Sequence, residues 1–508
     1  LAASKMRVLL GLLFLVVGIS AKHELLDTIQ RRRMDIEEDC PLCDYVYEDD
    51  GYFDYNVYDV VEQEDLELTT YFMNMTSQMW LDETFSNHPL WSHHVVVHVP
   101  HGNRQHDNAG MLYISSGSQD SSPPNIGSNH VRQMGDIASK HRIVTGVVRQ
   151  TPNQPIIFTE DPIQKQRWED DLIAWTWRKY GEDWNDTNIQ EDPRILARNP
   201  MCKGSVRAMD AMTLLVNDLD GTVLDDFMVS GQSKRGWTTW ITGAIDARVS
   251  AMAPAVLTCL NMTTNFMHYY QSFGGWPYYF WDYWNKGLMG WMLEPAMQAL
   301  ADVIDPYSYR VWMTMPKLII AGASDEFFLV DDSHYFLDDL PGESYMWLME
   351  DAGHSISNGP YDEEHWEMLG NFYESVLEGE SRPEFTWTIH TDEDNEQGSI
   401  RVNFPDEEPT SIIAYWADSI VPERRDWRIK MLNGSAIEPP PDGGVEIDTE
   451  ISWTGEPVED LGDGNYEFTM DYPDEGFRAF FIKLTFARND EEEYHFTTEA
   501  HIVPDYFP

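Results

Sequence analysis

Hydrophobic and polar positions follow two different patterns along this chain. From residue 91 to residue 377, short apolar runs are separated by segments whose apolar side chains recur at helical spacing. The runs predict strands at 94–99, 111–116, 143–148, 227–230, 249–253, 316–322 and 345–349, and the spaced segments predict helices at 131–140, 168–180, 206–219 and 362–377. This alternation predicts an α/β fold with a mostly parallel sheet and helices on both faces.

After Pro383 the apolar positions recur every second residue. The predicted strands are 386–390, 412–416, 466–470 and 477–484, separated by acidic turns and without a convincing helix between them. We therefore predict two domains, an α/β domain over residues 71–382 and a C-terminal all-β sandwich over residues 383–508.

An aromatic segment at 266–293 interrupts the strand–helix rhythm, with rings concentrated between Trp276 and Trp284. Because it lies between two predicted strands, it is expected to pass over the C-terminal edge of the sheet. It forms either a lid or substrate wall, with Trp276 and Tyr279 as candidate substrate contacts, or an inserted helix that only packs.

The N-terminus has the features of a secretory signal peptide over residues 1–21: a basic start, an apolar run at 8–18 and a small-residue exit. Residues 1–5 are expected to be non-native, because Met6 is a plausible start. Residues 22–70 are acidic and tyrosine-rich, which predicts an extended or partly ordered arm. No later apolar run is long enough to span a membrane, so we expect a secreted, extracellular protein with no membrane span in its mature form.

Sequons and cysteines agree with export. The predicted glycosylation sites are Asn74, Asn185, Asn261 and Asn433. The chain has 4 cysteines, and two disulfides are the first expectation, one joining Cys202 to Cys259 and one joining Cys40 to Cys43. A redox or zinc pair at Cys40 and Cys43 is the alternative.

The formal net charge of −53 argues against nucleic acid or an anionic membrane as a partner, although such a chain can collect calcium. No phosphate loop or dinucleotide fingerprint is present, so no cofactor is predicted. A histidine-rich patch has no cysteine beside it to complete a zinc set, so no metal site is predicted there; it comprises His93, His94, His98, His101 and His106.

The stretch 227–237 has the local pattern of a nucleophile elbow, in which a serine stands on a tight turn between a strand and a helix. Here the serine is Ser233, preceded by Gly231. The usual pattern places a second glycine two residues after the serine, where this chain has Arg235 and then Gly236. An ordinary serine in a strand–turn–helix crossover is the alternative interpretation.

A serine in an elbow needs a histidine base and an orienting acid, which follow it in the order acid, then histidine. Asp325 and His354 each follow a predicted strand and are expected at the strand edge that presents Ser233. The competing candidates are Asp331, Asp332, His334 and Asp351, of which Asp331 and Asp332 are expected at a helix start.

The oxyanion formed during acyl transfer needs backbone donors. We predict the N–H of Lys234 and a second N–H near Gly117 or Ser118, after the strand at 111–116. Gln150, Asn153 and Gln154 are candidates to line the same edge as substrate contacts, although a structural turn explains them equally well.

Three ordered blocks carry a family resemblance. The blocks are residues 231–240, residues 150–155 with 167–174, and residues 325–328 with 353–355. They resemble the PhoPQ-activated pathogenicity-related family, which includes secreted autocrine proliferation repressors, and the resemblance covers the chain from about residue 70 onward. It implies an α/β-hydrolase fold related to prolyl-oligopeptidase-type peptidases with a trailing β domain, and it implies that Arg235 is normal after the serine.

The sequence therefore predicts a secreted serine hydrolase, peptidase-like, in which Ser233 is the nucleophile, His354 the base and Asp325 the orienting acid. A peptide or a small ester is the expected substrate. The alternative is an extracellular signal that acts by binding a cell-surface receptor, with the three residues idle.

Overall fold

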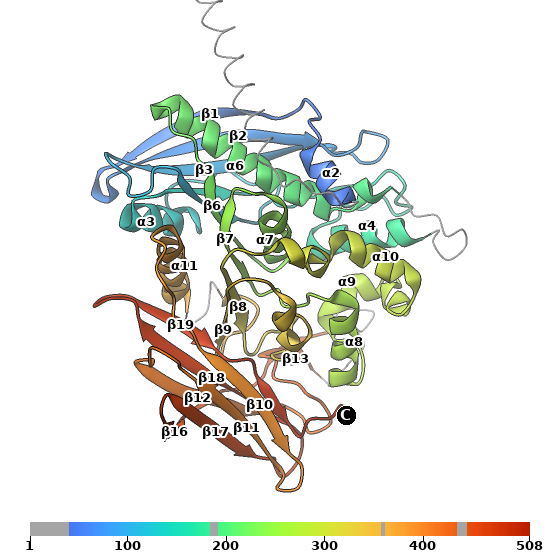
Figure 1. Cartoon of the computed structure of the whole chain (residues 1–508). Helices are drawn as coiled ribbons and strands as arrows, with labels where there is room; N and C mark the ends of the chain where they lie inside the picture. The colour runs from blue at the N-terminus through green and yellow to red at the C-terminus, as the bar shows by residue number, and fades with distance from the viewer. Residues whose placement is uncertain (1–39, 183–191, 357–360, 434–443) are drawn as a thin grey trace, which may run out of the picture.

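The computed structural model describes residues 40–182, 192–356, 361–433 and 444–508 (Figure 1). The predicted signal peptide, the part of the arm before residue 40 and the sequon at Asn185 lie outside the described residues.

A mostly parallel sheet forms the centre of the molecule, as predicted. Each of the seven strands predicted for this part of the chain is present. The observed strands are β3 (Leu90–Pro100), β4 (Ala109–Ile114), β5 (Val144–Val148), β6 (Asp226–Gln232), β7 (Val249–Ala255), β8 (Lys317–Gly322) and β9 (Ser344–Met349). From β5 the order is β5-β4-β6-β7-β8-β9, all parallel, and β3 joins β5 in antiparallel fashion. The carboxyl ends of the parallel strands therefore meet at one edge.

Helices cover both faces of this sheet, which confirms an α/β-hydrolase-type fold. The helices are α3 (Val131–His141), α4 (Glu169–Gly181), α6 (Arg198–Asp220), α7 (Lys234–Ile245) and α11 (Asp362–Leu377). Buried side chains of α4, α6 and α7 share one apolar cluster, and those of α3 and α11 belong to another. Among the described residues, no helix is both long and apolar enough to cross a bilayer.

The prediction of an extended or partly ordered arm over residues 22–70 is wrong for residues 40–70, which form regular secondary structure. Residues 40–70 contain α2 (Pro41–Tyr47), β1 (Asp54–Gln63) and, after the 3₁₀ turn η1 (Glu64–Leu66), the start of β2 (Leu68–Met79). β1 pairs with β2 and β2 with β3, so the arm supplies the edge of the central sheet. The acidic composition misled the prediction because β1 is an edge strand with mostly exposed side chains, whereas α2 buries Leu42, Tyr45 and Val46.

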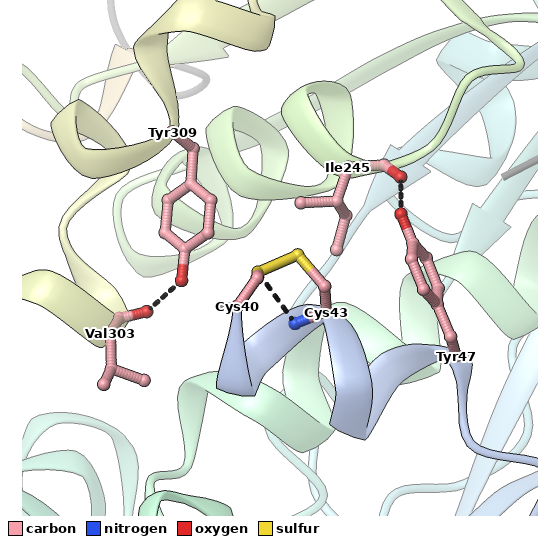
Figure 2. Close-up of a disulfide and its surroundings, with 6 residues drawn as sticks. All are labelled: Cys40, Cys43, Tyr47, Ile245, Val303 and Tyr309. Carbon is pink, nitrogen blue, oxygen red and sulfur yellow. Dashed lines mark hydrogen bonds between the residues drawn. A yellow bond between two sulfur atoms is a disulfide. The ribbon is translucent and has the colours of Figure 1, made fainter. Parts of the chain in front are cut away.

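One of the two predicted disulfides is present. Cys40 and Cys43 are bonded at the start of α2, with Cα atoms 5.2 Å apart, beside Ile245 of α7 and the contact of Tyr309 with Val303 (Figure 2). The second pairing is wrong, because Cys202 on α6 and Cys259 after β7 are both buried free thiols. Burial raises the pKa of Cys202 to about 12, so this thiol stays protonated and unreactive at neutral pH.

The aromatic segment forms an excursion of short helices between β7 and β8. The whole connection from β7 to β8, of which this segment is a part, contains α8 (Met262–Phe273), α9 (Trp281–Trp284) and α10 (Pro295–Ile304), with the 3₁₀ turns η3 (Tyr278–Phe280), η4 (Leu288–Trp291) and η5 (Pro306–Trp312). Three other 3₁₀ turns connect main elements: η2 (Pro193–Ile195), η6 (Asp332–Tyr335) and η7 (Leu337–Asp339).

The C-terminal region is a β-sandwich whose two layers share a core. One layer consists of β10 (Thr386–Asp392), β11 (Gln397–Asn403), β17 (Asn465–Asp471) and β16 (Glu459–Gly462). The other consists of β19 (Glu493–Thr497), β18 (Arg478–Ala487), β12 (Ser411–Asp418) and β15 (Thr454–Pro457), with β20 (His501–Val503) beside β18. Two further short strands pair with each other, β13 (Lys430–Leu432) and β14 (Glu446–Asp448).

The second layer of the sandwich continues the central sheet. Thr497 of β19 pairs with Met346 of β9, so the 14-stranded sheet runs from β1 to β15. Figure 1 shows these strands below the helical part of the molecule. The sandwich is thus hydrogen-bonded to the α/β part.

The predicted glycosylation sites differ in their access to solvent. Asn74 on β2 and Asn433 after β13 are exposed. The side-chain amide of Asn261, which precedes α8, donates to the Tyr335 carbonyl at 3.1 Å and is partly buried. Of these three, Asn261 is therefore the least suited to modification.

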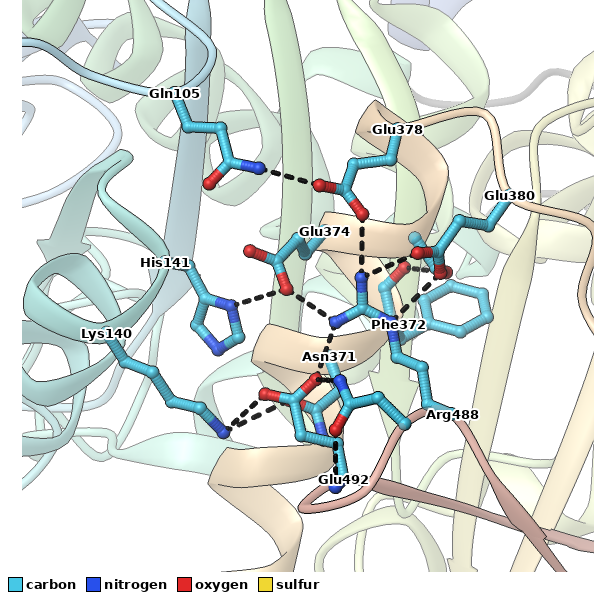
Figure 3. A network of polar contacts seen from close by, with 12 residues as sticks. Gln105, Lys140, His141, Asn371, Phe372, Glu374, Glu378, Glu380, Arg488 and Glu492 are labelled. Carbon is cyan, nitrogen blue, oxygen red and sulfur yellow. Dashed lines mark hydrogen bonds and ion pairs between the residues drawn. The ribbon is translucent and has the colours of Figure 1, made fainter.

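A charge network ties the sandwich to α11 (Figure 3). Arg488, at the end of β18, is 5% exposed and faces four carboxylates. The distances are 2.5 Å to Glu374, 3.0 Å to Glu378, 2.9 Å to Glu380 and 2.8 Å to Glu492. Without this guanidinium, four like charges would face one another at the junction.

Arg488→Met is expected to lower the free energy of unfolding by about 2–3 kcal/mol at pH 7, because it removes the cation that four carboxylates share in a partly buried site and leaves only Lys140 and His141 beside Glu492 and Glu374. Arg401→Met is the matched control, since Arg401 pairs with Glu467 on the surface and is 53% exposed; its loss should stay below about 1 kcal/mol. Urea unfolding measures both variants. Equal losses would show that the network does not fasten the junction.

Candidate active site

Ser233 stands on the turn that joins β6 to α7, as the sequence predicts. Its backbone has φ 58° and ψ −127°, a conformation that residues other than glycine rarely adopt. The Ser233 N–H donates to the Ala255 carbonyl on β7 at 2.9 Å. Such strain in a serine between a strand and a helix is the geometry of a nucleophile elbow.

The unusual glycine spacing has a steric cause. A Cβ on Gly236 would lie 2.6 Å from the Ala255 carbonyl oxygen, and a Cβ on Gly231 would lie 3.0 Å from the Ile114 carbonyl oxygen. Both positions therefore require glycine for the backbones to approach. The close approach falls on residue 236 of α7, so residue 235 is free to carry a long side chain.

Ser233, His354 and Asp325 lie in a hydrogen-bonded chain. His354 Nε2 is 2.8 Å from Ser233 Oγ, and His354 Nδ1 is 2.9 Å and 3.0 Å from the two carboxylate oxygens of Asp325. These distances meet the geometric requirement for a nucleophile, its base and an orienting acid.

Neighbouring groups hold the acid and the histidine in place. Asp325 is 4% exposed and accepts from the N–H groups of Phe327 at 2.7 Å and Phe328 at 3.2 Å. The backbone N–H of His354 donates to the Glu326 carboxylate at 2.6 Å, and the centre of the Phe327 ring lies 4.4 Å from that of the imidazole. Burial raises the pKa of Glu326.

The competing acids have other partners. Asp331 precedes η6 and pairs with His268 at 2.9 Å and Arg425 at 2.7 Å. Asp332 begins η6 and accepts from Tyr269 at 2.6 Å. Asp351 accepts from the Trp453 N–H at 2.8 Å, and the His334 N–H donates to the Asp331 carbonyl.

The predicted oxyanion donors are partly corrected. Lys234 is the first residue of α7, so its N–H has no acceptor within the helix. Ser118 is wrong, because its N–H donates to Ser121 Oγ at 3.0 Å, and Gly117 does not line the cleft around Ser233. Ser115 and Ser116 line it instead, and the Ser115 N–H is taken by the Val148 carbonyl. Ser116 therefore replaces Gly117 and Ser118 as the candidate second donor.

Two cavities meet at Ser233. An open cleft of about 530 Å³ contains Ser233, His354, Ser116, His130 and Arg235 in its lining. A narrow pocket of about 30 Å³ extends from Ser233 between aromatic rings, which include Trp177, Trp237, Phe266, Phe280 and Tyr283.

The aromatic segment thus contributes a wall, but through residues other than those predicted. Phe266, Phe280 and Tyr283 line the narrow pocket, whereas Trp276 packs on Tyr270, with ring centres 5.2 Å apart. The Tyr279 ring packs on that of Phe327, with centres 4.5 Å apart, and Phe327 in turn packs on His354. The spacing of these rings in the sequence does not reveal which of them faces the serine.

The amides of Gln150, Asn153 and Gln154 have structural partners, as in the alternative interpretation. Gln150 accepts from the His94 N–H at 2.6 Å, and Asn153 donates to the Ser92 carbonyl at 2.5 Å. Gln154 donates to Gly117 at 3.2 Å and accepts from the Glu169 N–H at 2.7 Å. The three residues are buried and fix the loop after β4.

Ion pairs that the sequence does not reveal surround the elbow. Arg235 donates to the Thr151 carbonyl at 2.6 Å and to Glu169 at 2.7 Å. Lys234 Nζ lies 3.2 Å from Glu169 and 3.0 Å from Asp170. Although burial alone would raise it, Arg235 and Lys234 lower the pKa of Glu169 to about 2. These pairs fasten α7 to α4.

The histidine-rich patch does not assemble a metal site within the described chain. His93 contacts Ser77 at 3.0 Å and His98 contacts Thr70 at 2.9 Å, so both are packed side chains. The described residues contain one group of potential ligands whose atoms lie within 4.8 Å of one another: His268, Asp331 and Asp332. Asp331 is already paired there with His268 and Arg425, an arrangement typical of a buried ion-pair network.

Comparison with known proteins identifies relatives. A family model described as PhoPQ-activated pathogenicity-related protein matches residues 42–428. The chain is 33% identical over 477 residues to "Autocrine proliferation repressor protein A" of Dictyostelium discoideum, covering 92% of this chain and 91% of that protein.

Similar solved structures are distant. An acetyl xylan esterase from Paenibacillus sp. R4 has a TM-score of 0.44 and 13% identity, covering 68% of this chain and 99% of that chain. The acylaminoacyl peptidase of Pyrococcus horikoshii has a TM-score of 0.37 and 11% identity, covering 65% and 51%.

The lowered pKa of Glu169 makes a prediction about acid stability. A carboxyl group whose pKa is lower in the folded state stabilises the fold above its ordinary pKa of about 4.5, and this contribution is lost as the pH falls toward 2. Glu169→Gln should therefore be less stable than wild type at pH 7 and should lose stability less steeply between pH 4.5 and 2. Urea unfolding across this range measures the difference, with Glu182→Gln, from an exposed pair with Arg178, as control. Parallel curves for wild type and Glu169→Gln would contradict the assignment.

Proposed function

Because the chain belongs to the PhoPQ-activated pathogenicity-related protein family and carries a hydrogen-bonded serine, histidine and carboxylate, we propose that it is a serine hydrolase that acts through an acyl-enzyme. The observation that carries this proposal is the contact of His354 Nε2 with Ser233 Oγ at 2.8 Å, with Asp325 on the other ring nitrogen.

The first step forms the acyl-enzyme. Ser233 Oγ attacks the carbonyl carbon of the substrate while His354 Nε2 takes the hydroxyl proton. Asp325 keeps the Nδ1–H of His354 directed toward itself and stabilises the imidazolium. The backbone N–H groups of Lys234 and Ser116 are the proposed donors to the oxyanion. When the tetrahedral intermediate collapses, the bond to the leaving group breaks and His354 returns the proton to it.

The second step releases the acid. A water molecule gives a proton to His354 and its oxygen attacks the acyl carbonyl, and the proton then returns to Ser233 as the ester bond breaks. The open cleft beside His354 leaves room for the leaving group and for water.

The proposed substrates are peptides or small esters, and the proposed location is extracellular. Export is supported by the signal-like segment at 1–21, the disulfide between Cys40 and Cys43 and the exposed sequon at Asn74. The proposal of peptidase activity rests on the family resemblance. The same chemistry releases an amine from a peptide or an alcohol from an ester.

A second candidate function follows from the name of the relative, a repressor of proliferation. In that case the chain is an extracellular signal that binds a cell-surface receptor, and the hydrolytic groups are idle. A proliferation assay with Ser233→Ala decides between them: full activity favours the signal, and lost activity favours the hydrolase.

A fluorophosphonate probe is expected to label the wild-type chain on Ser233, because this serine has a base within hydrogen-bond reach. Ser233→Ala should abolish labelling, and Asp325→Asn should slow ester turnover on the order of 10⁴-fold, as loss of the orienting carboxylate does in such triads. Gel fluorescence and peptide mapping locate the label.

Ser411→Ala is the matched control, since Ser411 lies on β12 in the sandwich and is partly exposed. It should label like wild type. The hydrolase proposal fails if the wild type stays unlabelled or if Ser233→Ala labels equally well.

A further inference from the structure

Arg198 is a buried arginine without a carboxylate partner. It is the first residue of α6 and is 1% exposed. Other buried arginines of this chain have such partners: Arg207 lies 3.0 Å from Asp210, Arg248 lies 2.7 Å from Asp246 and Arg428 lies 2.7 Å from Asp426. In the described part of the chain, no acidic group lies within 4.0 Å of the Arg198 guanidinium nitrogens.

The contacts of Arg198 use only part of its donors. Nη1 donates to the Lys234 carbonyl at 2.6 Å and lies 3.2 Å from Thr238 Oγ1, and the guanidinium carbon lies 4.6 Å from the centre of the Trp237 ring. Nε is buried and has no acceptor, and the hydrogen bonds that Arg198 makes to described residues all come from Nη1. Burial lowers the pKa of Arg198 to about 10, so the group remains charged at neutral pH.

Arg198 is among the residues that line the narrow pocket beginning at Ser233. Two other charged residues, Lys234 and Asp170, line the pocket, and they pair with each other at 3.0 Å. Asp170 also accepts from Tyr283 at 3.0 Å. The charge of Arg198 is therefore unbalanced, and the pocket is locally positive in a chain whose net charge is −53.

We propose that this pocket binds a carboxylate on the acyl part of the substrate, and that Arg198 thereby selects an acidic residue before the scissile bond. The inference deepens the proposed hydrolase function and rests on it. A buried cation with spare donors in a water-poor site gains most from an anion that accepts two hydrogen bonds. Because the pocket shares Ser233 and Lys234 with the open cleft, a group bound in it lies next to the carbonyl that the serine attacks.

The size of the pocket limits the length of this group. About 30 Å³ exceeds the roughly 10–15 Å³ that one water molecule needs, but it leaves no room for a long chain or a ring. The side chains of aspartate and glutamate fit this description, with their methylene groups against the aromatic rings and the carboxylate at Arg198.

Substrates that differ by a single charge test the inference. Thiobenzyl esters of N-acetyl-aspartate and N-acetyl-asparagine, and of the glutamate and glutamine analogues, are isosteric within each pair. In at least one of the two pairs, the wild-type kcat/KM is expected to be at least ~10-fold higher for the acidic ester than for its neutral amide counterpart, the effect of a charge-assisted hydrogen bond. Arg198→Met should reduce this ratio to about one, and Arg198→Lys should leave an intermediate ratio.

Binding supplies a readout that needs neither turnover nor a variant at residue 198. Calorimetry on the Ser233→Ala chain compares N-acetyl-aspartyl amide with N-acetyl-asparaginyl amide, and tighter binding of the acidic amide supports the pocket assignment. If that preference is present while no ester is turned over by wild type, the proposed function fails and the pocket assignment stands. If wild type hydrolyses the acidic and neutral esters equally, the inference is overturned and the hydrolase stands.

Discussion

The close approach of α7 to β7 at the turn carrying Ser233 is the constraint on which the site depends. Gly236 lets the helix backbone reach the Ala255 carbonyl, and the Ser233 N–H donates to that same carbonyl. The resulting turn holds the serine in a strained conformation above the carboxyl ends of the parallel strands. β8 and β9 end at the same edge, so Asp325 and His354 reach the serine without any long excursion of the chain.

Electrostatics around this turn connect the fold to selectivity. Arg235 and Lys234 are balanced by Glu169 and Asp170 on α4, and these pairs hold the helix that follows the serine. Arg198 on α6 donates to the Lys234 carbonyl and has no carboxylate within ion-pair distance among the described residues. The charges of Lys234 and Arg235 are balanced within the protein, whereas the charge of Arg198 remains available to a ligand. The chain has a net charge of −53, so a positive pocket is a local exception. A substrate that binds in it would carry a negative charge at the matching position.

The succession of strands and helices along the chain and the order of the motifs could be predicted from the sequence because both follow from local patterns. The strand ends predict the positions of Asp325 and His354, and Gly231 with Ser233 predicts the elbow, both in agreement with the structure. Side-chain direction could not be predicted in this way: Phe280 rather than Tyr279 faces the pocket, and Cys202 and Cys259 stay unbonded. The arm was misjudged because an exposed edge strand such as β1 has the composition of a solvated segment. Arg198 was missed, since only the packed structure shows that a buried cation lacks a partner.

The central claim is that Ser233 carries the acyl group of a substrate during turnover. Rapid quenching of the wild-type chain with an activated ester, followed by intact-mass measurement and peptide mapping, tests it most directly. We expect a transient mass increase equal to one acyl group per chain, located on Ser233, and a matching burst of leaving group. Turnover without an acylated Ser233, or with the acyl group on another residue, would contradict it.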